Sequence, residues 1–499
     1  MSQLTDSLNS QLTQQADKNI IKDEARNKWY TGNEIRQNVA LFEQALLRHG
    51  VHFGDVLVIR LANSADYAIL LQAIWNLGGI AHPVAATMPL EQISEEMSHY
   101  HYRYLIGDPS LISDDQQFQV TQLEPTNSLN LFLLQTDPTV GGKEMIQVPK
   151  EQDLALIMNT SGTTGSPKRV GLSHGILWHS AVQVIKSQNL TPEDTVLLLM
   201  PLFHINAQVI SLLATRLSRG KVVIAEKFSA SHFWQQVSNN HITWASIVPT
   251  IIKILSVNED SLKNYSVASS LKYLRSASFD LSEETCQTFE HLFNVPIIEG
   301  YGMTESASVI ALNPLNATKT GSVGVPVGTA VKIYTDEQQL TTKPDQVGEI
   351  VLKGDHVISD YVDSNPHSFF HEWLLTGDIG YFDDEGYLFL TGRKREMINH
   401  GGEKIPPVEV ENVLNKMESI SESAVIGEAD SFYGEKVVAY VILQGVWKFD
   451  LEERRREILQ YSKSHLPKYE QLADVHFVKD FPRNSTGKIQ RTRLAMIMS

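Results

Sequence analysis

The chain has 499 residues, which favours two or more domains, because a single hydrophobic core rarely grows beyond about 250–300 residues. Hydrophobic residues make up 42% and charged residues 20%, as in an ordinary globular protein. The 58 acidic residues outnumber the 42 Lys and Arg, and the formal net charge of −16 argues against non-specific nucleic-acid binding. The single cysteine, Cys286, excludes an intramolecular disulfide.

The N-terminal residues 1–18 are polar, and they lack the apolar core of a signal peptide. No stretch approaches the roughly 18 consecutive apolar residues of a membrane helix. We therefore expect a cytoplasmic protein without a membrane span. The sequence leaves open whether it is a monomer or a homodimer.

The first predicted strand covers Val56 to Leu61, and a helix follows that Asn63 or Ser64 can cap and that Gly78-Gly79 ends. Further strands are predicted at 154–158, 222–225, 242–248 and 295–298, with helices from about His174, over 207–217 and from His232, the last capped by Ser229. This alternation predicts an α/β fold with parallel-type sheets covered by helices.

The last hundred residues differ from the rest. They predict helices over 408–417 and 451–466 and strands over 423–426, 436–443 and 475–478, which is a small α+β unit. We expect a large N-terminal domain over 1–394 and a small, mobile C-terminal domain over 395–499.

The segment Thr160 to Lys168 reads TSGTTGSPK and follows a predicted strand. Its glycines permit close backbone approach, its hydroxyls can donate to phosphate oxygens, and Lys168 supplies positive charge. The spacing does not fit a P-loop. An ordinary turn and a phosphate-binding loop both remain open at this point.

Three other segments carry polar groups of the kind a nucleotide site needs. Glu299 to Glu305 reads EGYGMTE and offers an aromatic ring, a hydroxyl and a carboxylate suited to Mg²⁺. Asp378 stands at a predicted strand end, where a carboxylate suits the two hydroxyls of a ribose, or forms an Asx turn. Lys488 lies in PRNSTGKI, which alternatively is a solvated basic tail.

Together these four segments resemble the adenylate-forming superfamily of acyl-CoA synthetases, luciferases and peptide-synthetase adenylation domains. The resemblance covers nearly the whole chain. The segments 201–204 (PLFH), 228–234, 243–244 and 248–250 are most similar to small acyl-CoA synthetases of the oxalate–CoA ligase type. The resemblance implies a ligase that uses ATP and Mg²⁺ to adenylate a small-molecule carboxylic acid and then transfers the acyl group to coenzyme A.

The resemblance also implies residue roles. ATP or AMP would be bound by Thr160, Ser161, Gly162, Thr163, Thr164, Gly165, Lys168, Glu299, Gly300, Tyr301, Asp378 and Arg393. Catalysis would involve Lys488, Thr304, Glu305, which would also hold Mg²⁺, and His204, which alternatively is a helix-cap or core histidine. Arg395 would be the hinge, Gly401 and Gly402 would line the CoA channel, and the acyl pocket would contain Ser276, Ala277, Ser278 and Ser308.

The identity of the acid is the least determined part of this interpretation. Oxalate-using members carry a histidine where this chain has Ser308, and the pocket segments contain no replacing Arg or Lys. An unpaired second charge on the substrate would be costly to bury, which favours a neutral-tailed aliphatic or aromatic acid, with fatty acid metabolism as one setting. Alternative functions are an enzyme that loads a carrier protein's phosphopantetheine, an oxidative use of the adenylate, and an inactive nucleotide-binding regulator.

Overall fold

The computed structural model describes residues 1–109, 119–123, 131–136, 147–160, 168–265, 270–277, 281–445, 450–483, 489–491 and 493–494. The chain forms two compact units, the first made of Met1–Val331 and Leu352–Leu374, and the second of Lys332–Val351 and Leu375–Ser499. The two units are described separately below. The predicted domain boundary between residues 394 and 395 and the predicted motion of the C-terminal domain stay predictions.

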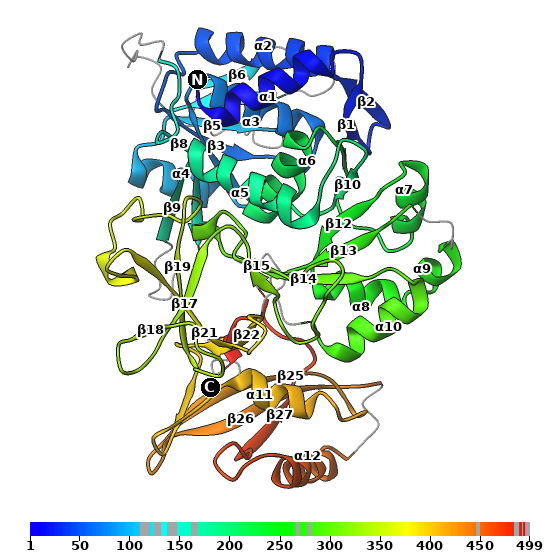
Figure 1. Cartoon of the computed structure of the whole chain (residues 1–499), viewed down its shortest axis with the longest axis vertical. Coiled ribbons are helices and arrows are strands. Elements are labelled where there is room, and N and C mark those ends of the chain that lie inside the picture. The colour runs from blue at the N-terminus through cyan, green and yellow to red at the C-terminus, as the bar shows by residue number, and fades with distance from the viewer. Residues whose placement is uncertain are drawn as a thin grey trace. The chain divides into compact units, whose positions relative to one another are not determined.

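A nine-stranded sheet forms the centre of one half of the first unit (Figure 1). In spatial order its strands are β16 (Val325–Pro326), β15 (Ala311–Leu312), β14 (Ile297–Tyr301), β13 (Tyr273–Ser276), β12 (Trp244–Ile247), β10 (Thr195–Leu198), β11 (Lys221–Ile224), β1 (Asn19–Asp23) and β2 (Lys28–Thr31). The six strands from β14 to β1 are parallel to their neighbours. Their carboxyl ends therefore lie along one edge, where ligands of such sheets usually bind.

A seven-stranded sheet forms the other half of the first unit. Its strands are, in spatial order, β6 (Gln119–Leu123), β7 (Leu131–Gln135), β5 (Tyr104–Gly107), β3 (Val56–Arg60), β4 (Ile80–Val84), β8 (Leu154–Thr160) and β9 (Lys168–Ser173). The inner strands β5, β3, β4 and β8 are parallel, and β9 returns antiparallel to β8. This return strand is absent from the sequence-based prediction, which placed a loop between β8 and the following helix.

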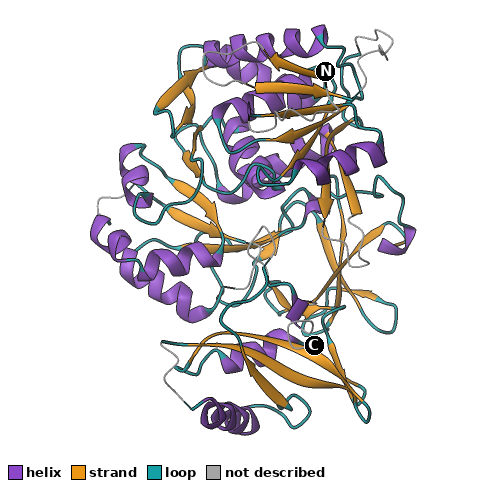
Figure 2. Cartoon of the chain, turned by 180° about the vertical axis from the view of Figure 1, so that it is seen from behind, coloured by secondary structure: helices purple, strands orange, loops and turns teal. Residues whose placement is uncertain are grey.

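Helices cover the two sheets of the first unit (Figure 2). They are α1 (Gln3–Gln14), α2 (Gly32–Arg48), α3 (Ala65–Asn76), α4 (Leu90–Tyr100), α5 (His174–Gln188), α6 (Ala214–Leu217), α7 (Phe233–Asn239), α8 (Pro249–Val257), α9 (Glu259–Asn264) and α10 (Glu283–Phe293). Ser64 caps α3 through its side chain, as predicted, whereas α7 has no side-chain cap, so the prediction of a Ser229 cap is wrong. Instead, the Ser229 hydroxyl lies 2.9 Å from His232 Nδ1.

The core beneath the nine-stranded sheet is built from alternate strand residues. Ala245, Ile247, Leu274 and Ile297 point to one face, where they join buried side chains of α7, α8 and α10 in a single apolar cluster. Residues between them in sequence, including Ser246 and Arg275, belong to the opposite face because side chains alternate along a strand. The apolar face stabilises the sheet, and the opposite face is available for polar contacts.

The second unit contains an α+β arrangement, as the sequence predicts (Figure 1). Its sheet consists of β24 (Glu403–Ile405), β23 (Ile398–His400), β26 (Gly434–Leu443) and β25 (Ile420–Asp430), with β27 (Asp474–Phe477) beside β26, and its helices are α11 (Pro407–Leu414) and α12 (Leu451–His465). Apolar clusters cover both faces of this sheet.

Six further strands complete the described part of the chain. These are β17 (Ala330–Tyr334), β18 (Leu340–Thr341), β19 (Gly348–Lys353), β20 (Phe369–Phe370), β21 (Trp373–Phe382) and β22 (Leu388–Arg393). The hairpin of β21 and β22 pairs Asp378 with Arg393. Asp378 thus lies in the middle of a strand, and the prediction that it stands at a strand end is wrong.

Candidate active site

The two ends of the predicted phosphate loop are held together by a β-hairpin. Thr160 ends β8, Lys168 begins β9, and the two residues are cross-strand partners. The Thr160 hydroxyl donates to the Lys168 carbonyl oxygen at 3.3 Å. Ser161, Gly162, Thr163, Thr164 and Gly165 lie outside the described residues. The hairpin therefore defines where this loop leaves the sheet and where it returns.

The Lys168 side chain is directed at residues that the sequence analysis did not single out. Its Nζ donates to Ser368 Oγ at 2.9 Å and lies 4.7 Å from the centroid of the Tyr361 ring. Within the described ranges, Lys168 forms no ion pair with a carboxylate. Its charge is thus stabilised by a hydroxyl and by the face of an aromatic ring, and it remains available to an anion.

Glu305 is connected to the same aromatic ring. It lies in a 3₁₀ turn, Thr304–Ser306, is only 6% exposed, and accepts a 2.9 Å hydrogen bond from the Tyr361 hydroxyl at Oε1. Burial and the neighbouring Glu305 carboxylate raise the pKa of Tyr361, so this hydroxyl stays protonated and acts as a donor. Lys168 and Glu305, which are far apart in sequence, are therefore joined through Tyr361.

The backbone around Glu305 adopts an unusual conformation. Ala307 and Ser308 have positive φ angles of 45° and 79°, although neither is glycine. The turn is held by a 2.9 Å bond from Ser308 N to the Met303 carbonyl and by the Ser180 hydroxyl, which donates to the Ala307 carbonyl at 2.8 Å. Such backbone strain is concentrated at functional sites. A side-chain carbon at Gly302 would approach the Ser308 carbonyl oxygen to 2.2 Å, so glycine is required there.

Tyr301 and Gly300 are placed at the end of β14. Tyr301 is 7% exposed, and its backbone pairs with Ala311 of β15. A side-chain carbon at Gly300 would lie 2.9 Å from Nη2 of Arg275 on the neighbouring strand. Glycine at this position therefore makes room for the Arg275 guanidinium. Glu299 is the residue before it and pairs with Ser276 of β13 in the parallel register.

The expected acyl-pocket residues are buried in the first unit. Ser276, Ala277 and Ser308 are 1%, 7% and 6% exposed, and Ser278 lies outside the described residues. The Ser276 hydroxyl has no hydrogen-bond partner in the described part of the chain. His204 Nε2 is buried and likewise without a partner there, and burial lowers the pKa of His204 to about 4, so its ring is neutral at pH 7.

His204 lies shortly before a π-helical segment, Asn206–Leu213, a rare conformation that frequently occurs at functional sites. From this segment, Asn206 Oδ1 accepts a 2.9 Å hydrogen bond from Ser246 Oγ on β12. Ser246 Oγ in turn lies 3.4 Å from Arg275 Nη1. A polar connection thus runs from the segment after His204 to the strand that ends in Ser276.

Sequence reasoning missed Tyr361, Ser368 and Arg275. Nothing local distinguishes Tyr361 or Ser368, because both act through contacts with residues far away in the chain. Arg275 did carry a signal. It is the one charged residue of the strand 273–276 and stands directly before the expected pocket residue Ser276.

The second unit holds the remaining expected nucleotide residues. Arg393 Nε lies 2.8 Å from Asp378 Oδ1 across the β21–β22 hairpin, and Asp378 is 5% exposed. Beside them, Lys394 Nζ lies 2.8 Å from Glu349 Oε2, and Glu349 Oε1 accepts a 2.9 Å bond from Gly377 N. The ion pair with Arg393 therefore holds the buried Asp378 carboxylate in a defined position.

Arg395 and the two glycines expected to line a CoA channel lie further along the second unit. Arg395 is exposed, and partial desolvation and the nearby Arg393 charge lower its pKa. Gly401 and Gly402 form the β23–β24 turn with φ angles of 63° and 97°, which favour glycine. Lys488 lies outside the described residues.

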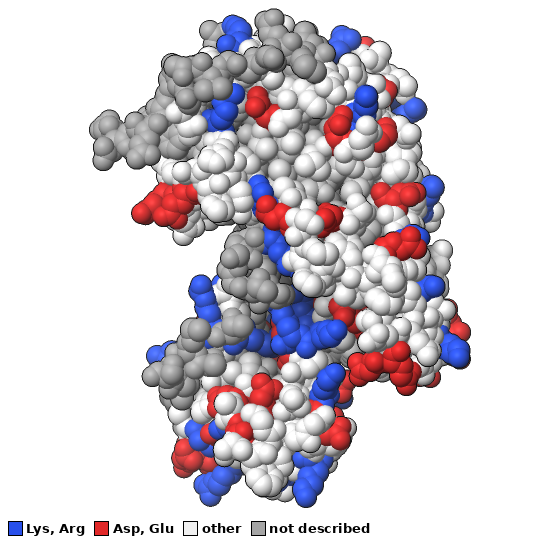
Figure 3. Space-filling view, turned by 90° about the vertical axis from the view of Figure 1, so that its left-hand side faces the viewer, with Lys and Arg blue, Asp and Glu red and all other residues white. Residues whose placement is uncertain are grey.

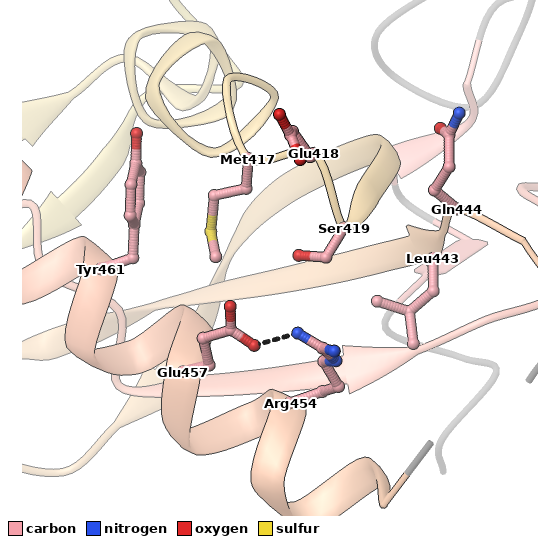
Figure 4. A pocket seen from close by; sticks show the side chains of 8 residues that line it. All are labelled: Met417, Glu418, Ser419, Leu443, Gln444, Arg454, Glu457 and Tyr461. Atoms are coloured by element: carbon pink, nitrogen blue, oxygen red, sulfur yellow. Dashed lines mark hydrogen bonds and ion pairs between the residues drawn. The ribbon is translucent and has the colours of Figure 1, made fainter. Parts of the chain in front are cut away.

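A surface pocket of about 520 Å³ lies elsewhere in the second unit (Figure 4). It is lined by Met417, Glu418, Ser419, Leu443, Gln444, Arg454, Glu457 and Tyr461, and Arg454 and Glu457 form an ion pair along α12. None of these is an expected site residue. We therefore assign the chemistry to the residues above and not to this pocket.

The described part of the chain lacks two features that would have pointed to other functions. It contains no helix long and apolar enough to cross a membrane and no group of three or more His, Cys, Asp or Glu side chains that would hold a metal by themselves. Acidic and basic side chains are interspersed on the face of the first unit seen in Figure 3.

The fold and these residues are those of an enzyme that binds a nucleotide. The AMP-binding enzyme family model matches residues 8–362, and the model of the AMP-binding enzyme C-terminal domain matches residues 409–488. The chain therefore belongs to the AMP-binding enzyme family.

Within this family, the chain is similar to several named CoA ligases. The chain is 32% identical over 462 residues to a sulfoacetate–CoA ligase of Cupriavidus necator, covering 89% of this chain and 88% of that protein. It is 30% identical over 464 residues to an oxalate–CoA ligase of Arabidopsis thaliana, covering 89% of each. The solved structure of o-succinylbenzoate CoA synthetase from Bacillus subtilis with its acyl-adenylate intermediate matches with a TM-score of 0.83 at 26% identity, covering 98% and 97% of the two chains.

Proposed function

We propose that this chain is an AMP-forming acid–CoA ligase, which adenylates a carboxylic acid with ATP and transfers the acyl group to coenzyme A. The observation that carries the proposal is the contact of Lys168 and Glu305 with one ring, that of Tyr361, in a member of the AMP-binding enzyme family. The neutral Tyr361 thus holds together Lys168, a cation suited to phosphate, and Glu305, a carboxylate suited to Mg²⁺.

The chemistry requires such an arrangement. A carboxylate is a poor electrophile, and its attack on the α-phosphorus of ATP brings two negative groups together. The site must supply positive charge and hydrogen-bond donors where negative charge accumulates. Lys168 and the loop that begins after Thr160 would bind the β- and γ-phosphates, and Thr304 would donate to the α-phosphate. The mixed anhydride that forms is a good acyl donor to the thiol of coenzyme A.

Glu305 fits a role in holding Mg²⁺. Carboxylate oxygen is a preferred ligand of this ion, which usually takes one or two carboxylates and completes its shell with water and substrate phosphates. A single buried carboxylate, oriented by Tyr361, matches that pattern better than a cage of several side chains would. When bound, the ion neutralises phosphate charge. Tyr361 holds the carboxylate in one orientation throughout.

The second unit would contribute three further functions. The Asp378 carboxylate, oriented by Arg393, suits the ribose hydroxyls of ATP. Lys488 would stabilise the charge that develops during adenylation, and Gly401 with Gly402 would border the path of the thiol. Since one site cannot accommodate Lys488 and an open thiol path together, residues 395–499 would turn about Arg395 between the two steps. An Arg395→Pro variant should then keep one half-reaction and lose the other, and equal activity in both would place the hinge elsewhere.

The identity of the acid has two candidate classes. The sequence favours a neutral-tailed acid, because the pocket segments contain no cation. The named relatives favour an acid with a second acidic group, since sulfoacetate, oxalate and o-succinylbenzoate all carry one. A role in fatty acid metabolism and a cytoplasmic location stay predictions.

The test is product analysis with a broad acid panel. Purified protein, ATP, Mg²⁺ and each acid should yield AMP and pyrophosphate, and acyl-CoA when coenzyme A is added. Formation of ADP and phosphate in place of AMP would contradict the proposal. Adenylate formation without acyl-CoA would instead favour a carrier-protein thiol as acceptor.

A further inference from the structure

Arg275 is a buried charge that forms no ion pair with any carboxylate of the described residues. Its side chain lies in the penultimate position of β13, and the residue is only 1% exposed. Nη1 lies 3.4 Å from Ser246 Oγ, which is a long hydrogen bond, while Nε and Nη2 have no hydrogen-bond partner among the described residues. Burial lowers the pKa of Arg275 to about 10, so the guanidinium is still charged at neutral pH. Holding such a charge unpaired in a protein interior is costly.

The position of Arg275 indicates what compensates this charge. Ser246, Arg275 and Gly300 all stand near the carboxyl ends of the parallel strands β12, β13 and β14. The carboxyl ends of parallel strands are where substrates of α/β proteins bind. Gly300 makes room for the guanidinium itself, because a side-chain carbon there would lie only 2.9 Å from Nη2.

The surroundings of Arg275 belong to the proposed acyl pocket. Ser276, the next residue, has a buried hydroxyl without a partner in the described part of the chain. Through Ser246 and Asn206, Arg275 is connected to the segment that follows His204, whose Nε2 is also without a partner there. Since side chains alternate along β13, Ser276 faces the other side of the sheet, and it is the hydrogen bonds through Ser246 and Asn206 that link Arg275 to the segment after His204.

A second buried arginine, Arg216, also has no carboxylate partner in the described part of the chain and one unsatisfied nitrogen, Nη2, but its other nitrogens are well bonded. Arg216 of α6 is 2% exposed, but Nε and Nη1 donate to the amide oxygens of Gln11 and Gln72 at 3.0 and 2.9 Å. Its partners come from α1 and α3, so Arg216 joins three helices and has a structural role. Arg275 has one hydroxyl partner at a long distance and no comparable structural function.

We propose that Arg275 binds a second anionic group of the substrate, so that the acid activated by this enzyme carries a carboxylate or sulfonate in addition to the carboxylate that is adenylated. This assignment rests on the proposed acid–CoA ligase function and names its substrate class. The planar guanidinium can donate two parallel hydrogen bonds to either anion. It also removes the reason for expecting a neutral-tailed acid, because Arg275, directly before the segment 276–278, would supply the pocket with a cation.

The experiment compares matched acids that differ in the second charge: glyoxylate with oxalate, propanoate with malonate and sulfoacetate, and benzoylpropanoate with succinylbenzoate. Pyrophosphate release with ATP and Mg²⁺ gives kcat/KM for each. In at least one pair the wild-type enzyme should prefer the dianionic acid by about 100-fold, the range expected of hydrogen bonds to a charged group. Equal or better use of the monoanionic member in every pair would overturn the proposal.

Variants then identify the residue responsible. Arg275→Met should lose about 100-fold in kcat/KM for the preferred dianionic acid and change little for its monoanionic partner. Arg275→Lys, which keeps the charge without the planar fork, should lie between the two. Arg216→Met is the matched buried-arginine control and should leave the ratio between paired acids unchanged. A loss of similar size for both acids in Arg275→Met would indicate a structural role and contradict the proposal.

A binding measurement covers the case in which a variant is poorly active. The preferred dianionic acid, with a non-hydrolysable ATP analogue, should raise the melting temperature of the wild type and not that of Arg275→Met. Without ligand, Arg275→Met should melt no lower than wild type, because it removes an unpaired buried charge. An equal ligand-induced rise in both proteins would contradict the proposal. If no acid yields AMP, the proposed function itself fails, whereas AMP from monoanionic acids alone would refute only this inference.

Discussion

Some charged residues near the expected site have different partners in the two compact units, although ion pairs such as Arg169–Asp363 also occur in the first. In the second unit the charges near the expected site are paired: Asp378 with Arg393, and Glu349 with Lys394. In the first unit, Lys168 and Arg275 have no carboxylate partner within the described residues, and their contacts are to hydroxyl groups and to the Tyr361 ring. Paired charges orient groups in the folded protein, whereas unpaired buried cations are suited to anions that arrive with the substrates. The predictions below test this difference.

The largest effect is expected for Glu305. Glu305→Ala should lower kcat/KM for adenylate formation by about 1000-fold, as for other groups that stabilise charge in a transition state. It should also raise the Mg²⁺ concentration needed for half-maximal rate, measured by pyrophosphate release. Tyr361→Phe, which keeps the carboxylate and removes only its donor, should have a smaller effect of the same kind. An unchanged Mg²⁺ requirement in Glu305→Ala would exclude the role in holding the ion.

Lys168 should be important for ATP binding and unimportant for stability. Lys168→Met should raise KM for ATP by about 30-fold, because one charge-assisted contact to phosphate is lost. Its melting temperature should stay near that of wild type, since no ion pair is broken in the folded protein. Lys263→Met is the control, because Lys263 forms an exposed pair with Glu259 on α9 and should affect neither property. A clear loss of stability in Lys168→Met would show that the residue is structural.

His204 should make the protein less stable in mild acid. Its pKa is lowered to about 4 in the folded state, below the ordinary value of about 6.5, because burial disfavours the charged ring. The unfolded chain therefore binds this proton first, and stability falls as the pH decreases from about 6.5 towards 4. In His204→Asn this contribution is absent, so the loss of unfolding free energy between pH 7.5 and 5 should be smaller by about 2 kcal/mol. Urea unfolding at the two pH values measures it, and His232→Asn, on an exposed residue, should behave as wild type.

The smallest effect is expected for the paired charges of the second unit. Arg491 lies 2.9 Å from Glu396 and 2.8 Å from Glu411. Arg491→Gln should lower the free energy of unfolding by about 1–2 kcal/mol, because it leaves two partly buried carboxylates with a weaker partner. The KM for ATP should not change, in contrast to Lys168→Met. A rise in that KM without loss of stability would contradict the distinction between the two units.

The sequence by itself determined the fold class and the chemical class of the site. Alternating apolar strands and helices predicted covered parallel sheets, and the segments around Thr160, Glu305, Asp378 and Lys488 pointed to ATP-dependent adenylation. Both signals are local, since periodicity and motif wording can be read without knowing what packs against what. The family matches over 8–362 and 409–488 agree with this interpretation.

Only the tertiary structure decided which residues meet around the reacting groups. Tyr361 and Ser368 lie about 200 residues from Lys168, and no local pattern connects them. Asp378 proved to be in a strand interior, because β22 pairs with β21 beyond the expected end. That Nε and Nη2 of Arg275 find no hydrogen-bond partner among the described residues is likewise a result of packing. A sequence shows that an arginine is present, whereas its burial and its neighbours across β12 and β14 determine whether its charge is compensated.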